Sequence, residues 1–381
     1  MFMMIFRTSL AATLLVAFLT ACATPGSKTI TLAEQGFFYV GGGYTKTKDG
    51  QVMTGQMYVQ YQVPERKTQP YPVVMWHGGG QTGTNFMGTP DGREGWANYF
   101  LRQGYVVYIV DQPGRARSGF FTDVYGATRR PNTTAMSRRF TAPEKSGDYP
   151  QAKLHTQWPG AGVPGDKVFD QFFASQVEDI ANVGVIENLN RAAGVALLDE
   201  IGPAILLTHS QSGPFGWVVA NDRPKLVKGI LAVEPNGPPF HEAAMTGAPD
   251  WFKDGSLGRA WGITRGPLAF SPAASSPADL GMTRQAAADA PDLVRCWTQG
   301  STPRQLSHLQ GIPILIITSE ASYHAPYDHC TSKFLSQAGV KNDFVRLPGA
   351  GIHGNGHMMM LEKNNMEIAA LLHNWAAKNI R

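Results

Sequence analysis

The sequence predicts an α/β fold with a mostly parallel, doubly wound sheet, and two observations lead to this fold class. Five short, uninterrupted apolar runs are typical of strands buried on both faces, and they span residues 72–76, 105–110, 204–207, 229–233 and 313–317. Helical periodicity lies between these runs, over residues 95–103, 171–198, 330–338 and 361–378. Buried strands that alternate with helices form a parallel sheet covered on both sides.

The composition is that of a globular protein, because 43% of the 381 residues are hydrophobic and only 16% are charged. The 33 Lys and Arg residues against 29 Asp and Glu residues give a net charge of +4, which is too small for a nucleic-acid-binding surface. We therefore expect no nucleic-acid partner. The three cysteines form no C-x-x-C pair, which excludes a disulfide-rich miniprotein and a zinc ribbon.

Residues 1–21 predict a lipoprotein signal peptide. One Arg precedes an apolar run over residues 10–19, which is shorter than the roughly 20 residues that a membrane-spanning helix needs. Leu19-Thr20-Ala21-Cys22 resembles the bacterial lipobox, which implies cleavage before Cys22 and its diacylation. An ordinary signal peptide with an incidental cysteine is the alternative. We expect a lipid-anchored protein of the bacterial cell envelope, periplasmic or at the outer membrane, that meets the membrane only through this lipid.

The rest of the chain divides into a lead-in and one domain. Residues 22–50 are expected to be an N-terminal tether and lead-in, and residues 51–381 the folded domain. Alternating apolar residues over 56–63 predict a half-buried antiparallel strand at its start. Two long stretches, 112–164 and 235–309, interrupt the alternation of strands and helices. Loops of this length are usually functional, so we expect lid or cap insertions over the carboxyl edge of the sheet.

A nucleophilic serine is predicted where the apolar run 204–207 meets the next helix. Ser210 stands in Thr208-His209-Ser210-Gln211-Ser212-Gly213, with small residues two positions before and after it. A sharp strand-to-helix turn that exposes a serine hydroxyl needs small residues at those positions. Glycines usually stand where this chain has Thr208 and Ser212. Ser212 is the rival nucleophile, but Pro214 would then lie inside the turn; a serine that only caps the helix is the structural alternative.

A glycine-rich turn, His77-Gly78-Gly79-Gly80, follows the apolar run 72–76. Glycines allow backbone N–H groups to approach a substrate oxygen closely, so Gly79 is a candidate oxyanion-hole donor. The N–H of Gln211, directly after the nucleophile, is the second candidate. We expect His77 and His209 to orient these loops by hydrogen bonding. A plain tight turn is the alternative for the glycines.

The general base and its carboxylate partner are sought after the nucleophile, because such triads run serine, acid, histidine along the chain. His357 lies in a Gly-rich loop just before the last predicted helix and is the candidate base, with His353 as runner-up. The acid has three candidates, all near strand ends: Glu234 after run 229–233, and Glu320 and Asp328 after run 313–317.

Several segments together resemble the bacterial esterase 713 family of α/β-hydrolases, from residue 73 onward; they are TPDGR at 89–93, DQPGRARS at 111–118, HSQSG at 209–213, VEP at 233–235 and HGNGHMMM at 353–360. The resemblance implies an α/β-hydrolase fold with Ser210 as nucleophile, Glu234 as acid, His357 as base, and Gly79 and Gln211 as oxyanion donors. The family can carry a Cys-Cys pair in the oxyanion loop, where this chain has Gly79-Gly80.

The expected activity is a serine carboxylic-ester hydrolase that forms an acyl-enzyme on a small or medium ester. A lactonase or amidase with the same triad, and a catalytically dead binding protein, are the alternatives. We expect no cofactor and no metal, because the spacing of His324, His329 and Cys330 matches no familiar zinc site. A homodimer is left open.

Two alternative roles are open for each of two further pairs of residues. Cys296 and Cys330 are predicted to form a structural disulfide in an oxidising compartment, with two buried free thiols as the alternative. Arg115 and Arg117 follow a strand and could bind an acidic substrate, or they could be solvated loop arginines.

Overall fold

The structure is a computed structural model that describes residues 29–381, so the predicted signal peptide and Cys22 lie outside the described residues. No helix within 29–381 is long and apolar enough to span a membrane.

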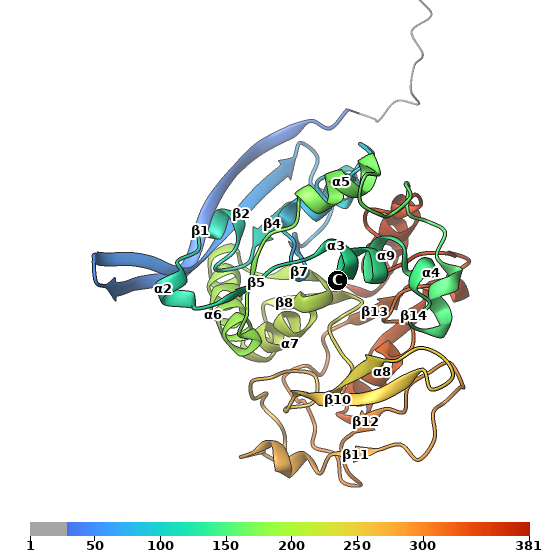
Figure 1. The fold of residues 1–381 in the computed structure, drawn as a ribbon. Helices are drawn as coiled ribbons and strands as arrows, with labels where there is room; N and C mark the ends of the chain where they lie inside the picture. Colours follow the sequence, from blue (N-terminus) through green and yellow to red (C-terminus); the bar gives the residue numbers. More distant parts are fainter. Residues whose placement is uncertain (1–28) are drawn as a thin grey trace, which may run out of the picture.

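An eight-stranded sheet forms the centre of the molecule (Figure 1). Strand β2 is antiparallel to both of its neighbours, β1 and β4, and all pairs from β4 to β14 are parallel. The mostly parallel α/β sheet and the antiparallel strand near its start are therefore confirmed. In spatial order the strands are β1 (Leu32–Thr47), β2 (Gly50–Pro64), β4 (Val107–Asp111), β3 (Val73–Trp76), β7 (Ala204–His209), β8 (Val227–Val233), β13 (Ile314–Thr318) and β14 (Asp343–Arg346).

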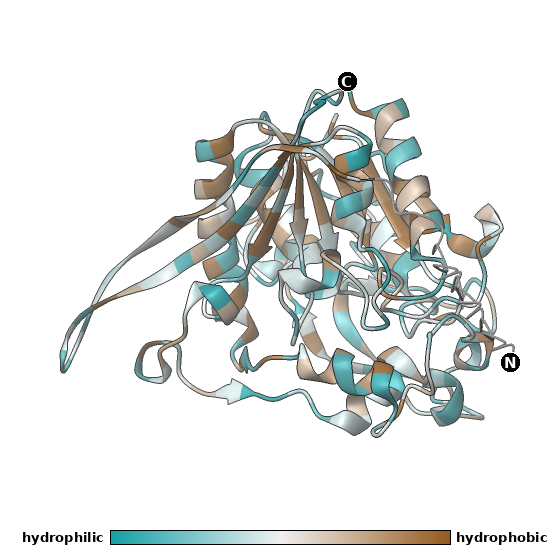
Figure 2. Cartoon of the chain, turned by 90° about the horizontal axis from the view of Figure 1, so that it is seen from above, coloured by the Kyte–Doolittle hydropathy of each residue, from teal (hydrophilic) through white to brown (hydrophobic). Residues whose placement is uncertain are grey.

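Helices cover both faces of the sheet, as the fully buried strands require (Figure 2). Val74 and Trp76 of β3 point into the apolar layer beneath α6 (Val183–Ile201), α7 (Gly213–Asp222) and α8 (Asp328–Gln337). Val73 and Met75 point to the other side, beneath α1 (Trp96–Arg102) and α9 (Asn365–Asn379). Because strands β4 to β14 are parallel, their carboxyl ends lie on one edge of the sheet, and the loops at this edge carry the site.

Three elements differ from expectation. The single helix expected over 171–198 is two helices, α5 (Lys167–Ala174) and α6, separated by the short strand β6 (Asp179–Ile180). Buried Asp179 and the α6 cap Asn182, whose side chain accepts from the N–H groups of Gly184 and Val185, end the continuous helix. The last helix begins at Asn365 instead of 361, after a turn. Within the expected lead-in, Leu32–Thr47 forms β1, and it continues with β2 as a hairpin that projects from the sheet (Figure 1).

Both long insertions carry their own elements. The first holds α2 (Thr122–Tyr125), β5 (Thr128–Arg129), α3 (Thr133–Met136), a π-helical turn (Ser137–Thr141) and α4 (Pro143–Ser146). The second holds the hairpin β9 (Phe240–Met245) and β10 (Phe252–Arg259) and the short pair β11 (Thr283–Arg284) and β12 (Trp297–Thr298). Cys296, next to β12, is joined to Cys330 of α8 by a disulfide with an S–S distance of 2.05 Å. The second insertion is thus covalently tied to the core.

Candidate active site

Ser210 lies at the strand-to-helix turn that the sequence indicated. It follows β7 directly and begins the short 3-10 turn Ser210–Ser212 that leads into α7. Its φ of 54° is in the left-handed region, a conformation that costs a non-glycine residue about 1–3 kcal/mol and that occurs at functional turns. Gly78 packs so closely that a Cβ there would lie 3.0 Å from the Cβ of Ser210. A side chain at position 78 would therefore crowd Ser210.

Ser212 has a structural role. It is fully buried, and its Oγ accepts from the N–H of His209 at 2.8 Å while lying 2.7 Å from the carbonyl oxygen of Trp76. These bonds connect β3, β7 and the turn. A hydroxyl engaged in this way is not available to a substrate, so the structure favours Ser210 over its rival.

His357 and Glu234 contact each other in the interior. His357 Nδ1 lies 2.5 Å from Glu234 Oε2, and both side chains are completely buried. The N–H of Ser319 donates to Glu234 Oε1 at 2.8 Å, and Ser322 Oγ donates to Oε2 at 2.7 Å. The carboxylate is thus held by three donors and keeps the imidazole in one orientation.

The other acid and base candidates pair elsewhere. Glu320 contacts the exposed His353, with 3.1 Å between Oε1 and Nδ1. Asp328 contacts the buried His324, with 2.8 Å between Oδ1 and Nδ1. Each of the three candidate carboxylates therefore holds a different histidine.

Burial sets the charge state of the pair. It lowers the pKa of His357 well below the usual value, and the neighbouring His324 and Arg139 lower the pKa further. The ring is therefore neutral at rest, and with Nδ1 donating to Glu234 its Nε2 carries the lone pair that a general base needs. Burial also raises the pKa of Glu234, against the hydrogen bonds from Ser322 and Ser319.

Rings on several sides fix the imidazole of His357. Phe140 and His324 stack on it at centroid distances of 5.1 and 4.7 Å, and His209 lies 4.5 Å away. His209 Nε2 also contacts the carbonyl oxygen of His357 at 3.1 Å. His209 therefore orients the loop of the base, as expected.

Tyr323 is part of the site although no sequence pattern indicated it. Its hydroxyl lies 3.4 Å from His357 Nε2, the atom that would take a proton from Ser210. Burial raises the pKa of this phenol, so it stays protonated. In the described part of the chain, the side-chain contact at Nε2 is with Tyr323 rather than with Ser210.

The glycine loop lies beside the turn at Ser210. A Cβ on Gly79 would lie 3.6 Å from Gln211 Cδ, so Gly79 packs against the side chain of Gln211. The carbonyl oxygen of Gly78 faces His77 Nδ1 and Arg115 Nη1, each at 2.9 Å. In a trans peptide the C=O and the next N–H point in opposite directions. The N–H of Gly79 therefore points away from His77 and Arg115, and Gly79 lines the cavity.

Arg115 and Arg117 form ion pairs with acidic residues of the protein. Arg115 is buried and paired with Asp179, which also accepts from Gln211 Nε2 at 3.1 Å. Burial lowers the pKa of Arg115 to about 9, so it is still a cation at neutral pH. Arg117 Nε donates to Asp111 at 2.6 Å. Neither arginine lines the cavity, and both are bonded inside the protein, which contradicts their expected role as substrate ligands. Arg115 is also not a solvated loop arginine, because it is buried.

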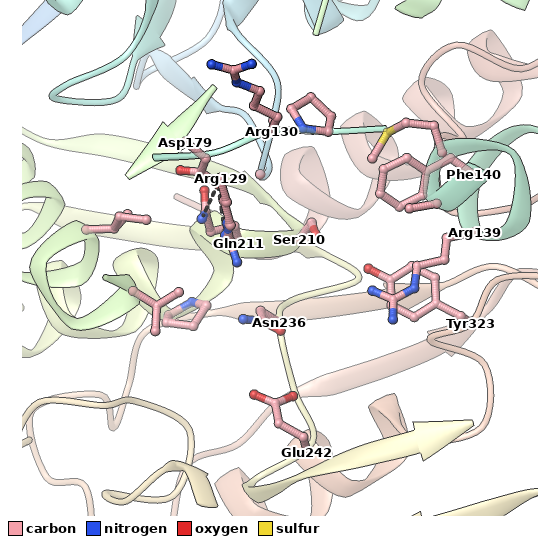
Figure 3. Close-up of a pocket in the computed structure, with 18 of the residues that line it drawn as sticks. Arg129, Arg130, Arg139, Phe140, Asp179, Ser210, Gln211, Asn236, Glu242 and Tyr323 are labelled. Carbon is pink, nitrogen blue, oxygen red and sulfur yellow. Dashed lines mark hydrogen bonds and ion pairs between the residues drawn. The ribbon is translucent and has the colours of Figure 1, made fainter. Parts of the chain in front are cut away.

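A cavity of about 380 Å³ opens in front of Ser210 (Figure 3). Both insertions line it, with Arg139 and Phe140 from the first and Glu242 and Arg265 from the second. Met136, Val183, Ile186 and Phe215 add apolar surface. Such a mixture of apolar walls and a few polar groups is typical of small-molecule sites.

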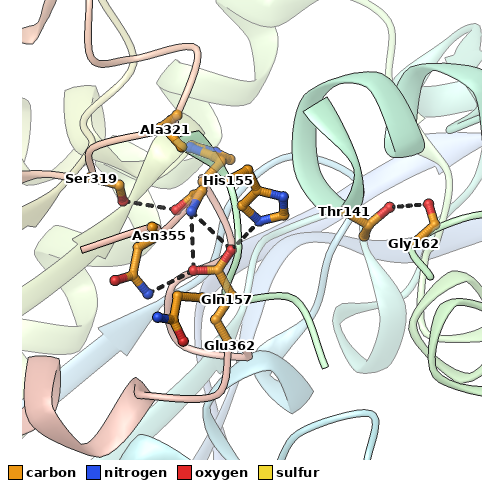
Figure 4. A network of polar contacts seen from close by, with 12 residues as sticks. Thr141, His155, Gln157, Gly162, Ser319, Ala321, Asn355 and Glu362 are labelled. Atoms are coloured by element: carbon orange, nitrogen blue, oxygen red, sulfur yellow. Dashed lines mark hydrogen bonds and ion pairs between the residues drawn. The ribbon is translucent and has the colours of Figure 1, made fainter. Parts of the chain in front are cut away.

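A buried polar network supports the loop that carries His357 (Figure 4). His155 of the first insertion contacts Glu144 through Nδ1 at 2.9 Å and Glu362 through Nε2 at 2.8 Å. Glu362 also accepts from the N–H of Gly356 at 2.9 Å and from Asn355 Nδ2 at 2.8 Å. Although burial acts in the opposite direction, the two carboxylates raise the pKa of His155 to about 9. His155 is therefore an imidazolium between two carboxylates.

Backbone bonds strengthen the same connection. The N–H groups of Thr156 and Gln157 donate to the carbonyl oxygen of Gly354 at 2.9 and 3.2 Å, and the N–H of Lys363 donates to the carbonyl of Gln157 at 2.9 Å. The first insertion and the loop of the base form one unit.

Among residues 29–381, two clusters bring together side chains of the kind that bind metals. The sulfurs of Cys296 and Cys330, near His329, are bonded to each other in the disulfide, so they are not free thiolates. Glu234, His324 and His357 also lie within 4.8 Å of one another, but the carboxylate already accepts from Ser319, Ser322 and His357.

Comparison with known proteins agrees with this architecture. The model of the alpha/beta hydrolase family matches residues 73–371, which confirms the predicted fold class and resemblance. A probable secreted lipase, phiG, from a fungal species (strain ATCC 74256) is 46% identical over 344 residues, which cover 90% of this chain and 89% of the relative. A solved structure described as a novel bacterial esterase has a TM-score of 0.62 at 24% identity, covering 93% of this chain and 98% of its own. That structure supports the fold alone.

Proposed function

The chain belongs to the α/β-hydrolase family, and we propose that it is a serine ester hydrolase that acts through an acyl-enzyme. The observation that carries the proposal is the buried contact of 2.5 Å between His357 and Glu234, together with a serine held at a positive φ in a strand-to-helix turn. The relative described as a probable secreted lipase supports ester hydrolysis as the reaction and secretion as the location.

In the proposed reaction, Ser210 Oγ attacks the ester carbonyl carbon while His357 Nε2 takes the hydroxyl proton. The N–H groups of Gly79 and Gln211 donate to the oxyanion. When the tetrahedral intermediate collapses, the C–O bond to the alcohol breaks, and the alcohol leaves with the proton from His357. A water molecule then attacks the acyl-enzyme, gives its proton to His357, and the acid leaves as the proton returns to Ser210.

Two features of the site serve this sequence of steps. Glu234 compensates the charge that His357 gains when it is protonated. Tyr323 must give up its contact with Nε2 before Ser210 can use that atom, because both would occupy the same lone pair.

Covalent labelling tests the nucleophile. A fluorophosphonate probe is expected to modify the wild-type protein, and peptide mapping should place the adduct on Ser210. Ser210→Ala should abolish labelling and lower kcat on a 4-nitrophenyl ester by roughly 10⁴-fold or more. His357→Ala should behave similarly, whereas His353→Ala, on the same loop but exposed, should keep most of the activity. An adduct on Ser212, or full activity of Ser210→Ala, would contradict the proposal.

The location of the protein is a second part of the proposal. We expect Cys22 to carry a lipid, because it is the last residue of a lipobox-like sequence and directly follows the predicted signal peptide. Metabolic labelling with an alkyne fatty acid in a bacterial host should mark the wild-type chain and not Cys22→Ser. Equal labelling of both proteins, or of neither, would leave an ordinary signal peptide as the explanation.

A further inference from the structure

We infer that the natural substrate is an ester that carries a free carboxylate, and that Arg139 binds this carboxylate. The inference rests on the proposed function and adds a substrate class to it. It starts from the charges of the cavity in front of Ser210, of which all but one have partners inside the protein.

Four arginines line the cavity, and three of them face carboxylates of the protein. Arg129 Nη2 lies 2.9 Å from Asp179, Arg130 Nε lies 2.6 Å from Glu178, and Arg265 Nη2 lies 3.6 Å from Glu242. Within residues 29–381, Arg139 makes no hydrogen bond and no ion pair. Its guanidinium lies over the ring of Tyr323, 5.5 Å from the centroid.

The charge of Arg139 lies close to the proposed general base. The ring of Tyr323 that it covers also lies 4.8 Å from the ring of His357. Figure 3 shows Arg139 and Tyr323 on one side of Ser210, with Arg129 and Asp179 on the other. A carboxylate on Arg139 would therefore belong to a substrate whose ester carbonyl is on Ser210.

The remaining acidic groups of the cavity do not compete for Arg139. Glu242 Oε1 accepts from the buried Arg259 at 3.0 Å, and Asp179 is held by Arg115 and Arg129. Glu187 accepts from the backbone N–H groups of Arg265 and Gly266 at 3.0 and 2.6 Å.

The rest of the wall suits the carbon chain of such a substrate. Met136 and Phe140 lie on the same helical turns of the first insertion as Arg139, and Ile186 and Phe215 face the cavity from α6 and α7. A cation, an apolar wall and the serine hydroxyl in one cavity of about 380 Å³ match a short dicarboxylic acid monoester.

Binding of this anion would also act on the base. Arg139 is one of the cations that lower the pKa of His357, after burial and His324. A substrate carboxylate would neutralise that charge, so His357 would become more basic when the anion is bound.

The test compares two esters that differ only in the terminal group: mono-4-nitrophenyl adipate, which ends in a carboxylate, and 4-nitrophenyl hexanoate, which ends in a methyl group. We expect the wild-type protein to have the higher kcat/KM on the adipate. Arg139→Gln should lower the ratio of the two kcat/KM values by about 10- to 100-fold, since one charged hydrogen-bonding partner is lost. Arg139→Lys should restore part of the ratio, and 0.5 M NaCl should reduce it in the wild type.

Arg138→Gln is the matched control. It removes the same charge from the adjacent residue, whose guanidinium is already paired with Asp148 at 2.6 Å. The ratio should stay within about twofold of the wild type, as expected for an exposed ion pair.

The outcomes separate the two proposals. Hydrolysis of the hexanoate without a preference for the adipate, or an unchanged ratio in Arg139→Gln, would overturn the carboxylate site and leave the ester hydrolase standing. Failure to hydrolyse either ester, together with no fluorophosphonate adduct on Ser210, would overturn both.

Discussion

Replacing His155 tests whether one buried imidazolium supports the loop of the base. In the structure both ring nitrogens contact carboxylates, and the pKa of His155 is raised to about 9 against an ordinary value of 6.5. A pKa raised on folding stabilises the folded state, with the full contribution present below the unfolded-state pKa. That contribution is lost as the pH rises through about 9.

The magnitude follows from the size of the shift. A change of about 2.5 pH units at 1.36 kcal/mol per unit gives about 3 kcal/mol. In His155→Gln this term is absent. The free energy of unfolding of the wild type minus that of the variant should therefore be about 3 kcal/mol larger at pH 6 than at pH 10.

Urea unfolding of both proteins across this pH range measures the difference directly. His353→Gln is the control, because His353 lies on the same loop and also faces a carboxylate but is 62% exposed. Its difference from the wild type should change by less than about 1 kcal/mol. A difference between the wild type and His155→Gln that stays constant from pH 6 to pH 10 would refute the reasoning, because His155 would then not be charged in the folded state.

Three further changes have defined outcomes. Arg115→Met removes a donor to the carbonyl of Gly78 and should lower kcat by about 10- to 100-fold with little change in KM; an unchanged kcat would show that the glycine loop needs no such support. Ser322→Ala removes one of the three donors to Glu234 and should reduce kcat/KM about tenfold, measured on a 4-nitrophenyl ester. Cys296→Ser opens the disulfide across 34 residues and should lower the free energy of unfolding by about 4 kcal/mol in urea titrations, and a loss below about 1 kcal/mol would contradict this.

The central strands were predictable because a strand that is buried on both faces appears in the sequence as a continuous apolar run. The runs at 72–76, 204–207 and 313–317 contain hardly any polar residue, and β3, β7 and β13 lie within them almost residue for residue. Strand β14 has exposed ends and only four residues, so it does not appear as a continuous apolar run. The helix expected over 171–198 fails for a related reason. Its periodicity is local, whereas the ion pair of Asp179 that interrupts it is made with Arg115, 64 residues away.

The candidate site was predictable to different degrees. The turn at Ser210 depends on neighbours in sequence, so its small residues identify it. The identity of the acid depends on which carboxylate contacts His357. Glu234, Glu320 and Asp328 each contact a histidine in the structure, and their spacing in the sequence does not show which histidine that is. Arg139 reaches the cavity from the π-helical turn of the first insertion, and Tyr323 reaches it from the loop between β13 and α8. Neither periodicity nor a motif relates them to His357.

The attachment of the first insertion to the loop of His357 has a mechanical consequence. Because His155, Thr156 and Gln157 are bonded to that loop, the insertion cannot swing outward as an independent flap. A large outward movement of the first insertion would also move the loop of His357, and the contact between His357 and Glu234 would break. We therefore expect the entrance to keep its width, so that molecules too wide for it do not reach Ser210.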